Sequence, residues 1–129
     1  MPIAAALKIL IVDDQFSVRQ VTRMALEEIG VRHIYEAEDG KKALDTVTTQ
    51  PLDLIISDFN MPEMDGIGLL QAVRGNPAVR KVPFILLTGR GDRELVVKAA
   101  QAGVNNYLIK PFTSAVLRQK IEQVIGKVT

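Results

Sequence analysis

Short apolar runs alternate with stretches of helical periodicity along the whole chain. Runs of four or five mostly apolar, branched residues are typical of buried strands, whereas apolar residues every three or four positions indicate helices with one buried face. The pattern predicts strands at Lys8–Val12, Ile34–Ala37, Leu54–Ser57, Phe84–Thr88 and Tyr107–Ile109. It predicts helices from Val18 to Ile29, over Gly40–Thr48, from an Asp65 cap through Val73, from an Asp92 cap through Ala99, and over Thr113–Val128.

Strands and helices that alternate in this way indicate an α/β protein. Five such units predict a doubly wound fold, in which helices cover both faces of a parallel five-stranded sheet. The strand at Ile34–Ala37 is expected at a sheet edge, because Tyr35 and Glu36 interrupt its apolar run. The 129 residues have the length of one domain, and no linker or internal repeat divides them. We therefore expect a single domain over residues 1–129, without an attached output domain.

Composition narrows the class of protein without identifying it. Hydrophobic residues make up 47% of the chain and charged residues 24%, as in ordinary globular domains, and no apolar stretch could span a bilayer. The N-terminal residues lack the pattern of a secretory signal, so we expect a cytoplasmic protein that does not act at a membrane. The absence of cysteine excludes disulfides, thiolate zinc sites and cysteine nucleophiles.

The net charge of +1 conceals an uneven distribution. Residues 1–79 carry 7 basic and 12 acidic side chains, whereas residues 80–129 carry 9 basic and 3 acidic ones. The two halves are expected to present fields of opposite sign, unless the imbalance is only that of an uneven solvated surface.

Chemistry-bearing side chains stand where the predicted strands end. Asp13 and Asp14 follow the first strand, Asp58 follows the third, Thr88 closes the fourth and Lys110 follows the fifth. The carboxyl ends of parallel strands meet at one edge of the sheet, where ligands of this fold class bind. Crowded carboxylates need a compensating cation, and oxygen ligands without cysteine favour Mg²⁺, with Mn²⁺ as the alternative.

A divalent metal beside an aspartate, a lysine and a hydroxyl suits transfer of a phosphoryl group onto the aspartate. Asp58 is the best candidate nucleophile because it stands alone at a strand end. Asp13 and Asp14 are then candidate metal ligands. An Asp-Asp pair can also cap a helix, but capping does not explain acids, a hydroxyl and an ammonium gathered at four strand ends.

Several short motifs occur in a fixed order: Val12-Asp13-Asp14, Ala37-Glu38-Asp39-Gly40, Ser57 through Pro62, Met64-Asp65-Gly66, Thr88, Ala102-Gly103 and Tyr107 through Phe112. Together they resemble the response-regulator receiver family, and more closely its single-domain chemotaxis members, from about Lys8 to the C-terminus. The resemblance implies a flavodoxin-like fold with strand order 2-1-3-4-5, an order taken over from that family.

The resemblance also implies roles for the site residues. Asp58 would be the phosphoacceptor, and Asp14, Asp58 and the backbone carbonyl of Asn60 would bind Mg²⁺, which Asp13 would support through water. Lys110 would pair with the phosphoryl group, and its bond to Pro111 is expected to be cis. Thr88 would donate its hydroxyl to the phosphoryl oxygens. Tyr107 would follow by turning from an exposed to a buried position.

Two further groups of residues are expected to adjust this switch. Asn60, Gly89 and Arg90 would tune the lifetime of the phosphoryl group, Arg90 by covering it and Gly89 by leaving the pocket open. The fourth helix, fifth strand and fifth helix would form the surface that changes. Its basic side chains and its tyrosine predict an acidic or amphipathic partner segment: Arg93, Lys98, Tyr107, Arg118, Lys120 and Lys127.

The function predicted first is a phosphorylation-controlled protein–protein switch, fed by a histidine kinase and acting in chemotaxis on the flagellar motor switch. The alternatives are a stand-alone receiver that serves a phosphorelay, a phosphate sink or a non-motor partner. A phospho-aspartate hydrolase is disfavoured, because Asn60 stands where such enzymes place a general acid, so only self-phosphorylation and self-dephosphorylation are expected. No nucleic-acid reader follows the basic half. A monomer is expected, with dimerisation on activation left open.

Overall fold

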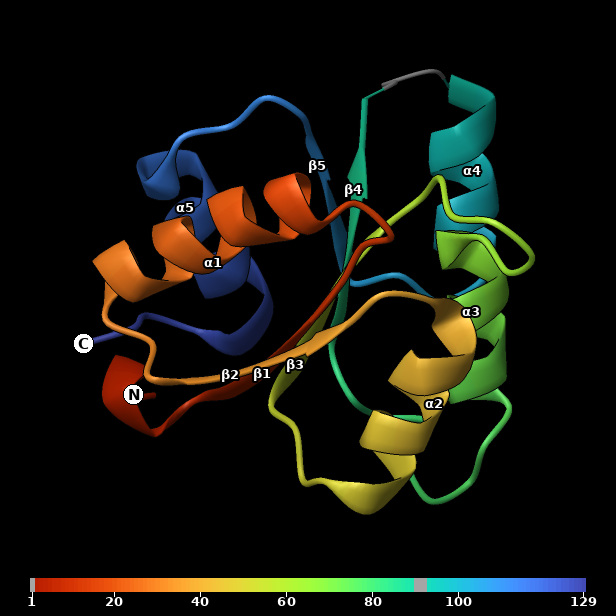
Figure 1. Cartoon of the computed structure of the whole chain (residues 1–129), viewed down its shortest axis with the longest axis horizontal. Helices are drawn as coiled ribbons and strands as arrows, with labels where there is room; N and C mark the ends of the chain where they lie inside the picture. The colour runs from red at the N-terminus through yellow and green to blue at the C-terminus, as the bar shows by residue number, and fades with distance from the viewer. Residues whose placement is uncertain (1, 90–92) are drawn as a thin grey trace.

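The computed structural model describes residues 2–89 and 93–129, which form a three-layer α/β sandwich (Figure 1). The parallel sheet has the strand order β2-β1-β3-β4-β5, which confirms the predicted fold class and order. The strands are β1 (Lys8–Val12), β2 (His33–Ala37), β3 (Leu54–Asp58), β4 (Phe84–Thr88) and β5 (Asn106–Ile109). In the described part of the chain the helices are α1 (Phe16–Ile29), α2 (Gly40–Thr49), α3 (Gly66–Arg74), α4 (Arg93–Gln101) and α5 (Ser114–Ile125), preceded by the 3₁₀ turn η1 (Ala4–Ala6).

Alternating side chains of the strands fill two cores, one on each face of the sheet. Ile9 and Ile11 of β1 join the core under α1 and α5, whereas Leu10 and Val12 join the core under α2, α3 and α4 (Figure 1). Burial on both faces explains why β1, β3 and β4 are almost continuously apolar. The partly exposed β2 lies at an edge of the sheet, as predicted.

Helix α5 is shorter than the sequence pattern predicts. Val128 keeps the apolar spacing of the helix, but α5 ends at Ile125, because Gly126 adopts a positive φ of 92° that carries the backbone off the helical path. The chain then folds back, so that the backbone N–H of Val128 donates to Glu122 Oε2 at 2.9 Å and the Val128 carbonyl accepts from Arg118 at 2.7 Å. Val128 is 1% exposed and completes the core under α1 and α5.

This return brings the two ends of the chain together. The N–H of Thr129 donates to the carbonyl of Pro2 at 3.0 Å, and the N–H of Ala4 donates to the carbonyl of Thr129 at 3.0 Å. Both ends lie at the amino-terminal end of the sheet, opposite the edge to which the strands point (Figure 1).

Side-chain caps define where most of the helices begin. Asp39, Asp65 and Thr113 accept backbone hydrogen bonds at the starts of α2, α3 and α5, and the Asp65 cap is the one predicted. The predicted Asp92 cap lies outside the described residues. Among the residues described, no helix has the length and apolar character needed to cross a membrane.

Candidate functional site

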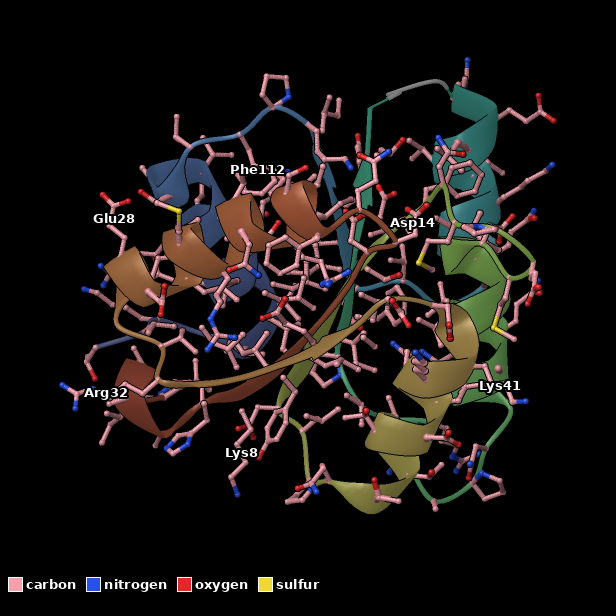
Figure 2. The ribbon with its side chains drawn as sticks, viewed as in Figure 1. Lys8, Asp14, Glu28, Arg32, Lys41 and Phe112 are labelled. Carbon is pink, nitrogen blue, oxygen red and sulfur yellow. The ribbon has the colours of Figure 1, made fainter. Side chains whose placement is uncertain are left out.

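The register of the sheet brings the predicted site residues to one edge. Val12 of β1 pairs with Ser57 of β3, so Asp13 and Asp14 lie beside Asp58. The last residue of β4, Thr88, pairs with Ile109 of β5, after which Lys110 follows. Figure 2 shows Asp14 beyond the end of β1, and Lys8 at the start of that strand.

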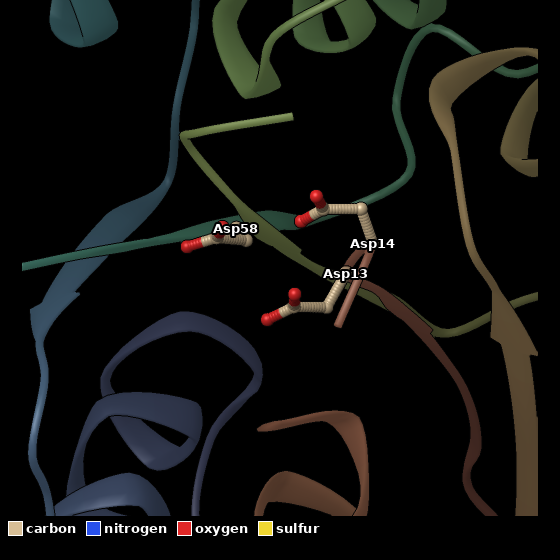
Figure 3. A group of neighbouring side chains, drawn as sticks. All are labelled: Asp13, Asp14 and Asp58. Atoms are coloured by element: carbon tan, nitrogen blue, oxygen red, sulfur yellow. The ribbon is translucent and has the colours of Figure 1, made fainter. Parts of the chain in front are cut away.

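The three carboxylates form a single cluster. An oxygen from each of Asp13, Asp14 and Asp58 lies within 4.8 Å of the others, two of the side chains coming from the end of β1 and one from the end of β3 (Figure 3). Asp13 and Asp58 are only 2% and 6% exposed, whereas Asp14 faces solvent. The cluster is therefore open on the side of Asp14.

Lys110 supplies positive charge from the other side of the cluster. Its Nζ atom lies 2.7 Å from Oδ1 of Asp58 and 3.8 Å from Oδ2 of Asp13. The peptide bond from Lys110 to Pro111 is cis, as expected. The N–H of Lys110 donates to the carbonyl of Thr88 at 2.8 Å, so the residue is held to the end of β4 before its side chain reaches Asp58.

Asp13 is the acid most affected by its surroundings. Burial raises its pKa, the neighbouring carboxylates of Asp58 and Asp14 raise it further, and the backbone N–H of Gln15 and the ammonium of Lys110 oppose them. The N–H of Gln15 donates to Oδ1 of Asp13 at 3.0 Å, but Oδ2 is buried without a hydrogen-bond partner within the part of the chain that is described. An unsatisfied carboxylate oxygen in a crowd of acids is a position that a cation would stabilise.

A divalent cation of the Mg²⁺ type fits this group of residues. The side-chain atoms that could ligate it are all oxygens, which such cations prefer. Three carboxylates this close together also repel one another unless a positive charge is added. Oδ2 of Asp13, buried without a hydrogen-bond partner among the described residues, is an observation independent of the acid count. Lys110 offsets only part of the negative charge, because its ammonium approaches Asp58 much more closely than Asp13.

Two of the three acids, Asp14 and Asp58, line an open depression of about 460 Å³. Asn60 and Gly89 line it together with Asp14, Asp58 and Lys110. A Cβ atom at Gly89 would meet nothing within 4 Å, so this side of the depression is sterically open. Thr88 is buried beside it, 3% exposed. Arg90, predicted to cover the site, lies outside the described residues.

The predicted partner surface is less uniform than the sequence indicates. Tyr107 is half-buried, and the ammonium of Lys120 lies 5.6 Å from the centre of its ring. Lys98 is exposed and pairs with Glu94 at 3.6 Å. Arg118 is exposed and also donates to the carbonyl of Val128 in the returning C-terminal segment.

The last two residues of the predicted partner surface are exposed as well: Arg93, the first residue of α4, and Lys127, which follows α5.

Two residues that contact Asp13, Gln15 and Arg19, were not predicted from the sequence. Arg19 of α1 donates from Nη1 to the backbone carbonyl of Asp13 at 2.7 Å and from Nε to Glu36 of β2 at 3.0 Å. No local motif signals this arrangement, because it joins residues of α1 and β2 that lie 17 positions apart.

The family model described as "Response regulator receiver domain" matches residues 9–122. The probable chemotaxis protein CheY of Rhizobium etli is 52% identical over 126 residues, which are 98% of each chain. The crystal structure of chemotaxis protein CheY4 of Vibrio cholerae is 33% identical and superposes with a TM-score of 0.86, over 92% of this chain and 98% of that one.

A third relative bears on the metal. The receiver domain of a sensor histidine kinase from Pseudomonas aeruginosa is 31% identical, with a TM-score of 0.84 over 94% of this chain and 98% of its own. That structure is described as having a magnesium ion coordinated in the active site cleft.

Proposed function

This chain belongs to the response regulator receiver domain family, and we propose that within it the protein is a two-component switch that is phosphorylated on Asp58. The observation that carries the proposal is the ion pair between Lys110 Nζ and Asp58 Oδ1 at 2.7 Å, next to the carboxylates of Asp13 and Asp14. It combines a strand-end carboxylate, a fixed ammonium and a cation-binding group in one open depression.

The reaction is the transfer of a phosphoryl group from the phosphohistidine of a histidine kinase. An oxygen of Asp58 forms the new bond to phosphorus while the bond from phosphorus to the imidazole nitrogen breaks. The electron pair stays on that nitrogen, which takes up a proton. Lys110 is placed to pair with the phosphoryl oxygens as they approach Asp58, and its charge offsets theirs.

Asp13, Asp14 and Asp58, with the backbone carbonyl of Asn60, are the groups that would hold Mg²⁺, or Mn²⁺ in its place. When bound, the cation neutralises negative charge on the transferring oxygens. Asp13, 2% exposed, is the least accessible of the three acids and would support the cation through water. Asn60 lines the depression beside Asp58, and its amide cannot titrate. The protein therefore phosphorylates and dephosphorylates itself rather than turning over outside substrates.

The phosphoryl group would change a surface at α4, β5 and α5. It adds roughly two negative charges and three strong acceptors. The Thr88 hydroxyl would donate to one of these acceptors, and Tyr107 of the neighbouring strand would then repack against β4. The ring of Tyr107 is half-buried, so it can still lose exposure on repacking. Gly89 and Arg90, with Asn60, would set how long the phosphoryl group lasts.

The output we propose is chemotaxis, through a separate partner at the flagellar motor switch. The relatives named as chemotaxis proteins support this output, and this chain matches 98% of the length of each of two of them. A receiver of this kind acts as a single domain whose exposed basic residues, such as Lys98 and Arg93, meet an acidic or amphipathic segment of the partner. A role in a phosphorelay, as a phosphate sink or with a non-motor partner is the second candidate, favoured by the likeness to a receiver domain of a sensor kinase.

The test is binding of a motor-switch peptide in the presence of Mg²⁺, with and without beryllofluoride as a phosphoryl mimic. We expect the mimic to tighten binding at least tenfold and expect Asp58→Asn to abolish the gain. Spectral changes on adding the mimic without peptide binding would exclude the motor output and retain the receiver. A wild-type protein that does not respond to the mimic at all would overturn phosphorylation at Asp58.

A further inference from the structure

Arg19 links the loop that carries two of the acids to the edge of the sheet. Its side chain is 13% exposed, and its Nη1 donates to the backbone carbonyl of Asp13 at 2.7 Å. Its Nε donates to Oε1 of Glu36 at 3.0 Å. The guanidinium also lies 5.5 Å from the centre of the Phe16 ring, in the first turn of α1. One planar group thus fixes three parts of the fold.

Glu36 is itself held firmly. Its Oε1 also accepts from Gln20 at 3.0 Å, and its Oε2 accepts from Arg23 at 2.8 Å. Partial burial alone would raise the pKa of Glu36, but the hydrogen bonds from Arg19, Arg23 and Gln20 hold it below the ordinary value. The carboxylate therefore stays charged at neutral pH and gives Arg19 a fixed anchor on β2.

The hydrogen bond from Arg19 to the Asp13 carbonyl also constrains the backbone of Asp14. That carbonyl is part of the planar peptide unit that joins Asp13 to Asp14, so its direction also sets the direction of the Asp14 N–H and Cα. The other end of Asp13 is tied to β2, where its N–H donates to the carbonyl of Ala37 at 3.1 Å. Within the described chain, the exposed side chain of Asp14 makes no hydrogen bond, so its direction depends on its backbone.

We propose that Arg19, anchored by Glu36, is a positioning residue that sets the peptide plane between Asp13 and Asp14 and so presents both carboxylates to a divalent cation. The inference rests on the proposed metal site and adds to it a residue that does not touch the cation or the phosphoryl group. Outer groups that orient ligands typically change metal affinity by about 10- to 100-fold.

The experiment is a calorimetric titration of the purified full chain with Mg²⁺ or Mn²⁺ alone, performed on wild type and on Arg19→Ala. We expect roughly tenfold weaker binding in Arg19→Ala. The matched control is Arg74→Ala. Arg74 is also partly buried and donates to backbone carbonyls, those of Gly103 at 3.0 Å and Val82 at 2.6 Å, but it lies at the amino-terminal end of the strands. Both variants should lose stability to urea, and only Arg19→Ala should lose metal affinity.

Metal affinity within twofold of wild type in a folded Arg19→Ala protein would overturn the inference. If that variant does not fold, Glu36→Gln tests the same anchor, with a few-fold loss expected and an unchanged affinity counting against it. Asp14→Asn separates the two proposals. A wild type that binds neither cation, or an Asp14→Asn variant that binds as tightly as wild type, would mean that the metal site itself is wrong.

Discussion

Lys110 forms an ion pair with Asp58 across the end of an intervening strand. Lys110 follows β5 and Asp58 closes β3, with β4 between them, yet Nζ of the lysine lies 2.7 Å from Oδ1 of the aspartate. The side chain of Asp58 is 9% exposed, and among the described residues this ammonium is the positive charge in contact with it.

Removal of this ammonium should slow phosphorylation of Asp58. In Lys110→Met the stem of the side chain remains but the charge is lost, and we expect the rate with acetyl phosphate to fall by about 10²-fold, as for loss of one preorganised donor. The rate is measured by intact-protein mass spectrometry. Lys120→Met, which removes a cation near Tyr107, should react at the wild-type rate. Equal rates for Lys110→Met and wild type would exclude a role for the ammonium in transfer.

At Gly66, helix α3 closely approaches the end of β3, where Asp58 lies. A larger residue at this position should therefore destabilise the contact between the two elements. A Cβ atom at Gly66 would lie 2.5 Å from the backbone oxygen of Asp58 and 2.6 Å from Cδ1 of Leu86. Overpacking costs about 1–3 kcal/mol, and the preference of helices for alanine offsets about 1 kcal/mol of it.

Because contacts of 2.5 and 2.6 Å place the cost near the upper end of that range, we expect Gly66→Ala to lower the free energy of unfolding by about 2 kcal/mol in urea titrations. Gly89→Ala, which meets open space, should change it by less than about 0.5 kcal/mol. Equal effects of the two substitutions would contradict the contact between Gly66 and Asp58.

The anchoring carboxylate of Glu36 should give stability a specific pH dependence. Its pKa in the folded protein is lowered from an ordinary value of 4.5, so the unfolded chain binds more protons as the pH falls below that value. The stabilisation is therefore fully present above pH 4.5 and is lost as the pH falls through the lowered pKa. Urea titrations at several pH values should show wild type more stable than Glu36→Gln at pH 7, with the gap closing in acid. A difference in the free energy of unfolding that stays constant as the pH is lowered into the acid range would mean that Glu36 is not held as a charged group.

The returning C-terminal segment should contribute to the core although it lies beyond α5. Val128 is 1% exposed, whereas Val97 of α4 is 45% exposed. Val128→Ala removes two buried methyl groups and leaves a cavity, so we expect it to lower the free energy of unfolding by about 2 kcal/mol. Val97→Ala should change it by less than about 0.5 kcal/mol. Thermal or urea unfolding of the two variants gives the comparison, and similar losses would argue that residues 126–129 do not pack as described.

The position of the acids could be predicted from the sequence because strand ends are visible in one dimension. Asp13, Asp58 and Lys110 each follow a short apolar run, and parallel strands necessarily bring such positions to one edge. The strand order itself came from the family resemblance, since periodicity alone does not say which strands are neighbours.

The residues that failed to stand out are those whose contacts are tertiary. Glu36 was interpreted only as an interruption of an edge strand, yet it binds Arg19 and Arg23, which lie on another element. Val128 continued a helical pattern that Gly126 had already ended, because burial has the same signature whichever path the backbone takes. Arg118 was assigned to a partner surface by its charge, and its hydrogen bond to Val128 has no local signal.

The hydrogen bonds between Pro2 and Thr129 make the backbone nearly a closed ring. A short peptide could join these two residues, and the chain could then be opened elsewhere to give a circular permutant with the same core. An opening between α2 and β3, remote from the carboxylates at the other end of the strands, would leave the cation-binding group intact. A dye or fusion partner could equally be attached at residues 2 or 129 and stay clear of the depression around Asp58.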